Sequence, residues 1–231
     1  TAEISPASLD LAQKIWSEYE STPFDDPRFE VVIEDGRIWL EHQTKSFDLI
    51  FSGTNRSFYP GSTNLFSVEY LQMLKGTLNP GGVVQQWIPR YPDHQSVVLI
   101  KTFLSVFPDG LLVAYRDPSR RVAYYYMLGF GDGTPFDLTT QIENAFRRAP
   151  EIFSTAAIST PEEFLATLKI PRRAILAELD TPLVYDDLPV VEYDRSAKKL
   201  GVWVDMNKFT QDYSPARLKQ YLQPTPMAEQ W

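Results

Sequence analysis

A regular alternation of short apolar runs with helical patterns between residues 47 and 128 constrains the fold more than any other feature of the sequence. Residues 47–51 (FDLIF) are short enough for a strand, and such a run is typical of a strand buried on both faces. Residues 67–78 carry apolar side chains at helical spacing, Asn-Pro-Gly-Gly at 79–82 stops that helix, and 83–88 returns as a strand. This alternation predicts an α/β fold with a doubly wound, mainly parallel sheet.

The sheet is predicted to end in an antiparallel hairpin. A helix over about 93–107 precedes two strand-like runs, 111–115 and 122–128. The Arg-Asp-Pro-Ser sequence at 116–119 is typical of the turn between two such strands. We therefore expect an antiparallel edge on the parallel sheet.

The N-terminal residues show a further strand, helix and strand. Residues 2–4 are predicted to be the end of a strand, and Ser-Pro at 5–6 is typical of a helix start. The helical spacing continues to about Glu20. A β-rich run at 29–33 then leads into an Asp-Gly turn at 35–36.

The pattern changes after the predicted hairpin. We therefore expect three parts: a core over 1–128, short helices and an extended segment over 129–199, and a C-terminal tail over 200–231. The shorter elements are predicted as helices at 138–148, 161–168, 171–178 and 215–222, and as an extended segment at 182–194.

Composition excludes several classes of function. The 231 residues carry a formal net charge of −8, which gives no electrostatic support to nucleic-acid binding. The absence of cysteine excludes disulfides and thiolate chemistry, and two histidines argue against a histidine-rich metal cluster. No apolar run approaches the ~18 residues that span a bilayer.

Several sequence blocks occur together in a fixed order. They are 47–50 (FDLI), 64–67 (NLFS), 78–82 (LNPGG), 86–87 (QW) and 181–193 (TPLVYDDLPVVEY), with 26–28 (DPR) and 35–37 (DGR) before them. Together these blocks resemble the spermidine synthase family, and most closely the branch in which this domain is fused behind membrane helices. The resemblance spans about residues 1–195 and implies a Rossmann-like methyltransferase fold.

The resemblance implies aminopropyl transfer from decarboxylated S-adenosylmethionine to an amine, at a site made mostly of carboxylates. It assigns Glu3 to the ribose hydroxyls and Asp35 to the adenine, with Gly36 permitting a tight turn. From the residues alone, Glu3 is equally well a surface acid at a strand end, and Asp35 equally well part of a plain Asp-Gly turn. Both interpretations stay open.

The sequence also departs from the family. The strand that carries the family's Gly-rich loop is absent, and Gly53 stands where the family has a proton-accepting Asp or Glu. Loss of a general base alone slows a reaction ~10²–10⁴-fold. Arg56 adds a permanent cation that would repel a polyamine. Asp48 lies about five residues from the loop, or roughly 16 Å at strand rise, and cannot replace the missing acid.

We therefore expect no catalytic residue and no required cofactor. Binding of decarboxylated S-adenosylmethionine or S-adenosylmethionine through Glu3, Asp35 and Gly36 stays open. The preferred hypothesis is a catalytically degenerate domain that serves as a structural or docking subunit of a larger, membrane-associated assembly. The alternative is an active aminopropyltransferase or other S-adenosylmethionine-type transferase that a separate N-terminal polypeptide completes. A methyltransferase on the same fold is a weaker third hypothesis.

A missing first strand also predicts a partner. In the family this strand lies between the strands that correspond here to 2–4 and 47–51, so another polypeptide or an upstream segment is expected to supply it. The chain begins at Thr1 rather than Met, which suggests processing or truncation. The compartment stays open, and the fused branch favours the cytoplasmic face of a membrane.

Acidic residues also cluster near the end of the recognisable region. Asp186, Asp187 and Glu192 are interpreted as part of a capped turn before Pro189, followed by an edge strand. A site role for these acids is the less favoured interpretation.

Overall fold

The computed structural model describes residues 1–19, 21–53, 61–88, 94–116, 123–132, 137–193 and 208–222. Thr54–Pro60, and with them Arg56, lie outside the described residues. The chain forms two compact units, Thr1–Ser46 and Phe47–Trp231, a different division from the one predicted from sequence. Each unit is described by itself.

The first unit is a small parallel sheet with helices. Its elements are β1 (Ala2–Glu3), α1 (Pro6–Trp16), the 3₁₀ helix η1 (Pro23–Asp25), β2 (Val32–Ile33) and α2 (Gly36–Glu41). The predicted helix start is confirmed, because the Ser5 side chain accepts a hydrogen bond from the Ser8 amide and Pro6 is the first helical residue. No side chain of α1 is buried within this unit, so its apolar stripe is exposed.

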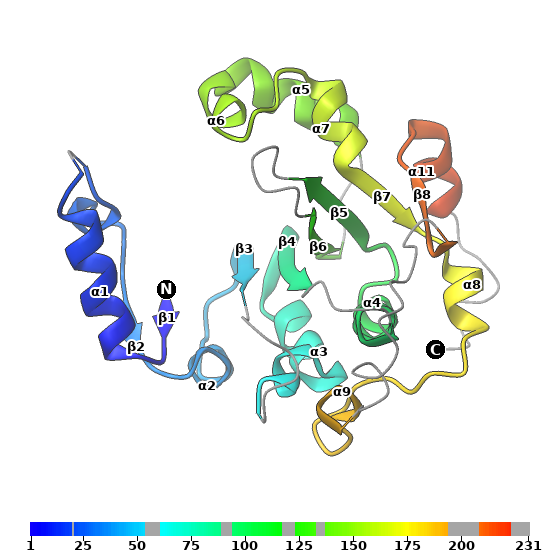
Figure 1. Ribbon diagram of the computed structural model, residues 1–231, viewed down its shortest axis with the longest axis horizontal. Coiled ribbons are helices and arrows are strands. Elements are labelled where there is room, and N and C mark those ends of the chain that lie inside the picture. The colour runs from blue at the N-terminus through cyan, green and yellow to red at the C-terminus, as the bar shows by residue number, and fades with distance from the viewer. Residues whose placement is uncertain are drawn as a thin grey trace. The chain divides into compact units, whose positions relative to one another are not determined.

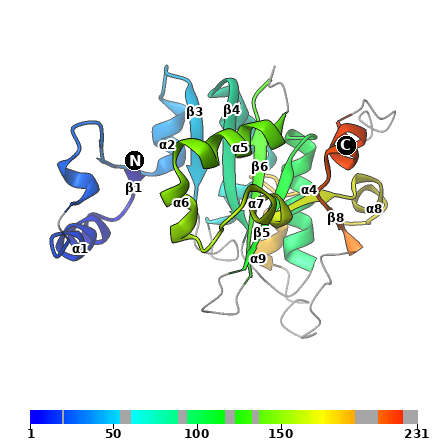
Figure 2. The same ribbon diagram turned by 90° about the horizontal axis from the view of Figure 1, so that it is seen from above.

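The second unit contains a six-stranded sheet with helices on both sides (Figures 1 and 2). Its strands are β3 (Phe47–Ser52), β4 (Leu78–Ile88), β5 (Leu111–Arg116), β6 (Ala123–Phe130), β7 (Leu168–Pro171) and β8 (Thr210–Asp212). Its helices are η2 (Thr63–Phe66), α3 (Val68–Gly76), α4 (His94–Val106), α5 (Leu138–Arg148), α6 (Pro150–Thr155), α7 (Pro161–Thr167), α8 (Arg173–Ala177), α9 (Val190–Tyr193) and α11 (Pro215–Tyr221).

The strand order is β3-β4-β6-β5-β7-β8. β3 pairs with β4 in parallel, and β6 is antiparallel to both β4 and β5. Strands β3, β4 and β5 therefore run in one direction, and the predicted α/β class with an antiparallel hairpin is confirmed. The hairpin of β5 and β6 lies inside the sheet rather than at its edge, because β6 pairs with β4 and β5 pairs with β7. The sequence did not predict β7 and β8, which extend the sheet beyond β5 in antiparallel order. Strands of three or four residues carry too little periodicity to be recognised.

Strand β4 begins earlier than expected, because Asn-Pro-Gly-Gly lies within the strand as an irregularity. The pairing register with β3 shifts between Phe47 and Leu49. Gly81 has a φ of +78°, a conformation that favours glycine. A Cβ on Gly82 would lie 2.8 Å from the carbonyl oxygen of Phe47 and 2.9 Å from that of Asn79. These two glycines allow β4 to approach β3 closely at the bulge.

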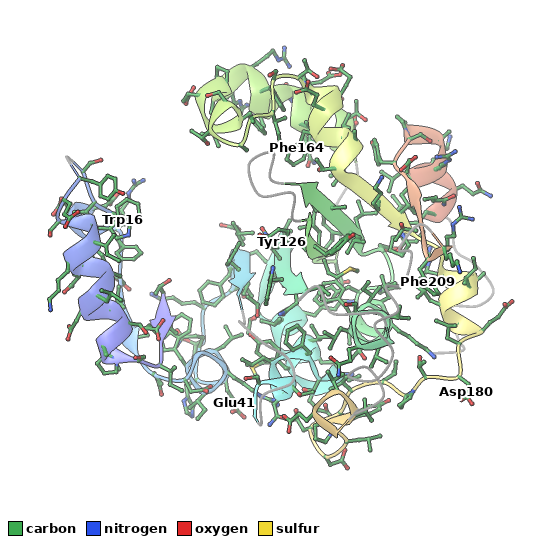
Figure 3. All side chains as sticks on the ribbon, viewed as in Figure 1. Trp16, Glu41, Tyr126, Phe164, Asp180 and Phe209 are labelled. Carbon is green, nitrogen blue, oxygen red and sulfur yellow. The ribbon has the colours of Figure 1, made fainter. Side chains whose placement is uncertain are left out.

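Helix α4 is the centre of the core. All side chains of residues 95–104 are buried, including polar ones, as is typical of a helix covered on every side. Figure 1 shows α3 and α4 on one side of the sheet and α5, α6 and α7 on the other. The latter three are joined by a ring stack of Phe146 on Phe153 and an edge contact of Phe153 with Phe164, which is labelled in Figure 3.

Two further expectations are corrected. Residues 182–193 form an isolated bridge between Tyr185 and Leu188 followed by helix α9, not an extended edge strand. Their polar backbone groups bond to α3 and α4 rather than to a neighbouring strand. Strand β3 is not buried on both faces within its unit, because Leu49 and Phe51 are 63% and 64% exposed. β3 is the terminal strand of its sheet, which leaves one face poorly covered.

Candidate functional site

The two acids that were predicted to bind a nucleoside lie at the same end of the small sheet in the first unit. β1 and β2 run parallel, with Glu3 opposite Ile33, so Glu3 and Asp35 both lie at carboxyl ends of strands. Ligands of open α/β sheets bind outside these ends. The placement is thus compatible with the predicted role of both acids.

Both carboxylates also have local structural roles. Glu3 Oε1 accepts a hydrogen bond of 2.8 Å from the Ser5 amide. Asp35 is the N-cap of α2, and its Oδ1 accepts from the amides of Arg37 at 2.9 Å and Ile38 at 3.1 Å. An ionised carboxylate offers about four lone-pair positions, so these bonds leave capacity for a hydroxyl or amino group.

Gly36 opens helix α2 instead of making a tight turn that requires glycine. Its φ is not in the left-handed region, and an added Cβ would have only an ordinary contact of 3.8 Å with the Cβ of Ala2. The conformational reason for glycine that the sequence suggested is therefore absent here.

The second unit presents Gly53 directly after β3 as an exposed residue. A Cβ at this position would lie 3.2 Å from Cε1 of Phe51, a ring that is itself exposed and can move. The preceding residue, Ser52, is buried, and its Oγ lies 3.3 Å from the Tyr70 hydroxyl. The backbone therefore accommodates a larger residue at 53, and the glycine is not imposed by packing.

Gln86, the first residue of the block at 86–87, is opposite Ser52 in the pairing of β3 with β4, and the sequence does not predict the burial of its side chain. The Gln86 side chain is fully buried. Its Nε2 lies 3.5 Å from the Trp87 carbonyl oxygen, and its Oε1 has no hydrogen-bond partner among the described residues. A buried polar group without a partner is uncommon and costs ~1–3 kcal/mol. Only the structure reveals that this glutamine lies on the core face of β4.

Two further acids, Asp48 and Asp26, form local side-chain contacts. Asp48 Oδ1 accepts from Asn79 Nδ2 at 2.8 Å, at the start of β3. Asp26 forms an ion pair of 2.5 Å with Arg28, and the hydrogen bonds from Arg28 lower the pKa of Asp26. In the described part of the chain, no three His, Asp or Glu side chains are grouped in a way that could hold a metal ion. No helix within the same ranges is long and apolar enough to cross a membrane.

Comparison with known proteins agrees with the sequence blocks between residues 26 and 87, and the block at 181–193 lies outside the matched region. Residues 3–102 match the sequence model of the spermine/spermidine synthase domain. The polyamine aminopropyltransferase of Hamiltonella defensa subsp. Acyrthosiphon pisum (strain 5AT) is 33% identical over 81 residues, which are 35% of this chain and 28% of that protein. The enzyme of the same name from Klebsiella pneumoniae (strain 342) has the same identity and coverage. The match thus spans less than a third of the length of these curated relatives.

Solved structures give a weaker likeness. The spermidine synthase from Thermotoga maritima is 16% identical and has a TM-score of 0.48, with 96% of this chain and 58% of that chain covered. A spermidine synthase in complex with the transition state analogue AdoDATO has a TM-score of 0.47, at 16% identity and the same coverage. The fold assignment rests on the strands and helices described above. The chain carries a spermidine synthase-like domain of α/β class, and its curated sequence relatives are aminopropyltransferases.

Proposed function

We propose that this chain is a catalytically degenerate spermidine synthase-like domain that serves as a docking subunit of a larger, membrane-associated assembly. One observation carries the proposal: the residue directly after β3 is an exposed glycine, where the resemblance implies a carboxylate. Without a carboxylate at this position, no side chain there accepts the proton of an attacking amine.

Retained nucleoside binding is part of the same proposal. Glu3 and Asp35 each lie at a strand's carboxyl end and keep acceptor capacity beyond their backbone hydrogen bonds. A bound decarboxylated S-adenosylmethionine or S-adenosylmethionine would then stabilise the domain without turnover.

Docking is supported by the edge of the larger sheet. Among the described residues β3 pairs only with β4, so no described strand pairs with its other edge. Leu49 and Phe51 add an apolar surface on the same strand. Natural proteins rarely leave such an edge uncovered, because it promotes aggregation. We propose that a strand from another polypeptide, or from an upstream segment, covers it. The membrane-associated part of the proposal rests on the resemblance to the fused branch.

The alternative is an active transferase completed by that same strand. Its support is the match of residues 3–102 to the spermine/spermidine synthase domain, together with the match over 81 residues to polyamine aminopropyltransferases. Both hypotheses predict a partner, and they differ only in turnover.

The test combines binding with activity. Calorimetric titration of the chain with decarboxylated S-adenosylmethionine measures binding, and product analysis with putrescine or spermidine measures aminopropyl transfer. We expect no transfer above background, and Gly53→Asp restores little because the Gly-rich loop is still missing. Saturable turnover by the wild-type chain would overturn the proposal.

A further inference from the structure

The segment 179–193, named the strap, lies across helix α4 and contains the acids Asp186 and Glu192. The strap follows α8, includes Asp180 near its start and ends with α9 (Figures 1 and 3). At its start, Lys101 Nζ donates to the carbonyl oxygens of Leu179 at 2.8 Å and Thr181 at 3.0 Å. These bonds join residues 78 and 80 positions apart in sequence, so the strap is held by tertiary contacts.

The rest of the strap is anchored to the same helix. Thr102 Oγ1 accepts from the Val184 amide at 3.0 Å, and Gln95 Nε2 donates to the Val191 carbonyl oxygen at 3.3 Å. Val184 and Val191 are themselves buried. The strap is therefore fixed at its start, middle and end, which makes it a rigid support for side chains that project from it.

The strap meets the start of helix α3 on its other side. The Val68 amide donates to the Val184 carbonyl oxygen at 2.9 Å. Asp186 Oδ1 accepts from Ser67 Oγ at 2.6 Å. Ser67 is the N-cap of α3, and its Oγ also accepts from the Tyr70 amide. The same hydroxyl lies 3.0 Å from the Asn64 carbonyl oxygen, so Asp186 is the nearer of two acceptors for its proton. Asp186 thus contributes to orienting the hydroxyl that caps the helix.

Glu192 contacts Gly61, the first described residue after Gly53. Its Oε1 accepts from the Gly61 amide at 2.9 Å, across 131 residues of sequence. Gly61 has a φ of +83°, so its backbone is held in a conformation that favours glycine. A carboxylate that accepts from a backbone amide makes a charge-assisted bond, which is stronger than one between neutral groups.

We infer that Asp186 and Glu192 are positioning residues, a clamp that holds residues 61–68 in a fixed conformation beside the carboxyl end of β3. The two acids fix opposite ends of this segment, Glu192 at Gly61 and Asp186 at Ser67. The order of 61–68 is therefore coupled to the docking of the strap on α4. This coupling holds whether or not the domain is catalytic. It gives Asp186 and Glu192 a structural role that the sequence, which predicted a capped turn followed by an edge strand, did not indicate.

The test is amide hydrogen exchange measured residue by residue by NMR. Glu192→Ala should raise the exchange rate at Gly61 about tenfold, because the amide loses its charged acceptor. Glu192→Gln should restore most of the protection, since its amide oxygen still accepts. The matched control is Asp187→Asn, at an exposed acid between Tyr185 and Leu188. It should leave the exchange rate at Gly61 unchanged.

A second pair of variants tests the other end of the clamp. Asp186→Ala and Ser67→Ala should each raise exchange at Tyr70, and the double variant should show little more than either single change. Unchanged exchange at Gly61 in Glu192→Ala, or strictly additive effects of Asp186→Ala and Ser67→Ala, would overturn the inference.

Discussion

The hydroxyl groups of Ser52 and Tyr70 lie 3.3 Å apart in the interior, where the last residue of β3 meets helix α3. The Ser52 side chain is buried, and the residue after it is exposed. That residue is Gly53, where the resemblance to the spermidine synthase family implies a proton-accepting carboxylate.

The open edge of β3 predicts the behaviour of the isolated chain. Replacing Leu49 and Phe51 together by Lys should reduce self-association, because charges on an edge strand oppose pairing with other strands. The thermal midpoint should hardly change, since both side chains are largely exposed. Light scattering and thermal unfolding measure the two effects.

A matched control is Leu188→Lys, at an exposed apolar residue outside the sheet. It should leave self-association unchanged. If the Leu49 and Phe51 double variant instead loses several degrees of thermal stability, these side chains are packed in the native protein and the edge is not available.

The close approach of β4 to β3 makes Gly82 sensitive to substitution. Gly82→Ala should lower the free energy of unfolding by about 1–3 kcal/mol, because the new Cβ would clash with two carbonyl oxygens. Gly76→Ala is the control, at the last residue of α3, where nothing lies within 4 Å of the added Cβ. It should be neutral or stabilising by up to about 1 kcal/mol. Urea denaturation of both variants measures the difference, and equal losses would contradict the proposed clash.

Because Tyr221 is buried, we expect the free energy of unfolding to fall at high pH. Its ring is buried on α11, and its hydroxyl donates to the Gly110 carbonyl oxygen at 2.7 Å. Burial raises the pKa of Tyr221 well above its usual value of 10.0. The folded state therefore favours the protonated form, and this contribution is fully present below pH 10 and is lost as the pH rises further.

The measurement is the free energy of unfolding between about pH 9 and 11, compared with that of Tyr221→Phe. The wild-type value should fall more steeply with pH than that of the variant. At neutral pH the variant should be less stable by about 1 kcal/mol, since Gly110 loses a donor. Parallel pH profiles would show that Tyr221 is not buried as described.

Local signals in the sequence predicted the elements that depend on them. Ser5 caps the helix that Ser-Pro at 5–6 predicted, and the helices predicted over 67–78 and 161–168 have Ser67 and Thr160 as their N-caps. The strap could not be predicted, because its bonds to Lys101 and Thr102 join residues about 80 positions apart. No local pattern encodes such pairings.

Some features of the candidate site could likewise be predicted from the sequence, and others could not. The placement of Glu3 and Asp35 at strand ends followed from sequence blocks, and the structure agrees with it. The block at 86–87 does not predict that Gln86 is buried, because a glutamine in a strand is exposed or buried according to which face is covered. The nucleoside-binding role of Glu3, Asp35 and Gly36 stays a prediction.

The most direct test of the central claim is aminopropyl transfer by the native assembly, purified through an affinity tag on this chain. The account predicts background levels of aminopropylated amine with decarboxylated S-adenosylmethionine and putrescine, even with the partner strand in place. Saturable product formation that disappears when Glu3 and Asp35 are replaced by Ala would contradict it, and would identify the chain as the catalytic subunit.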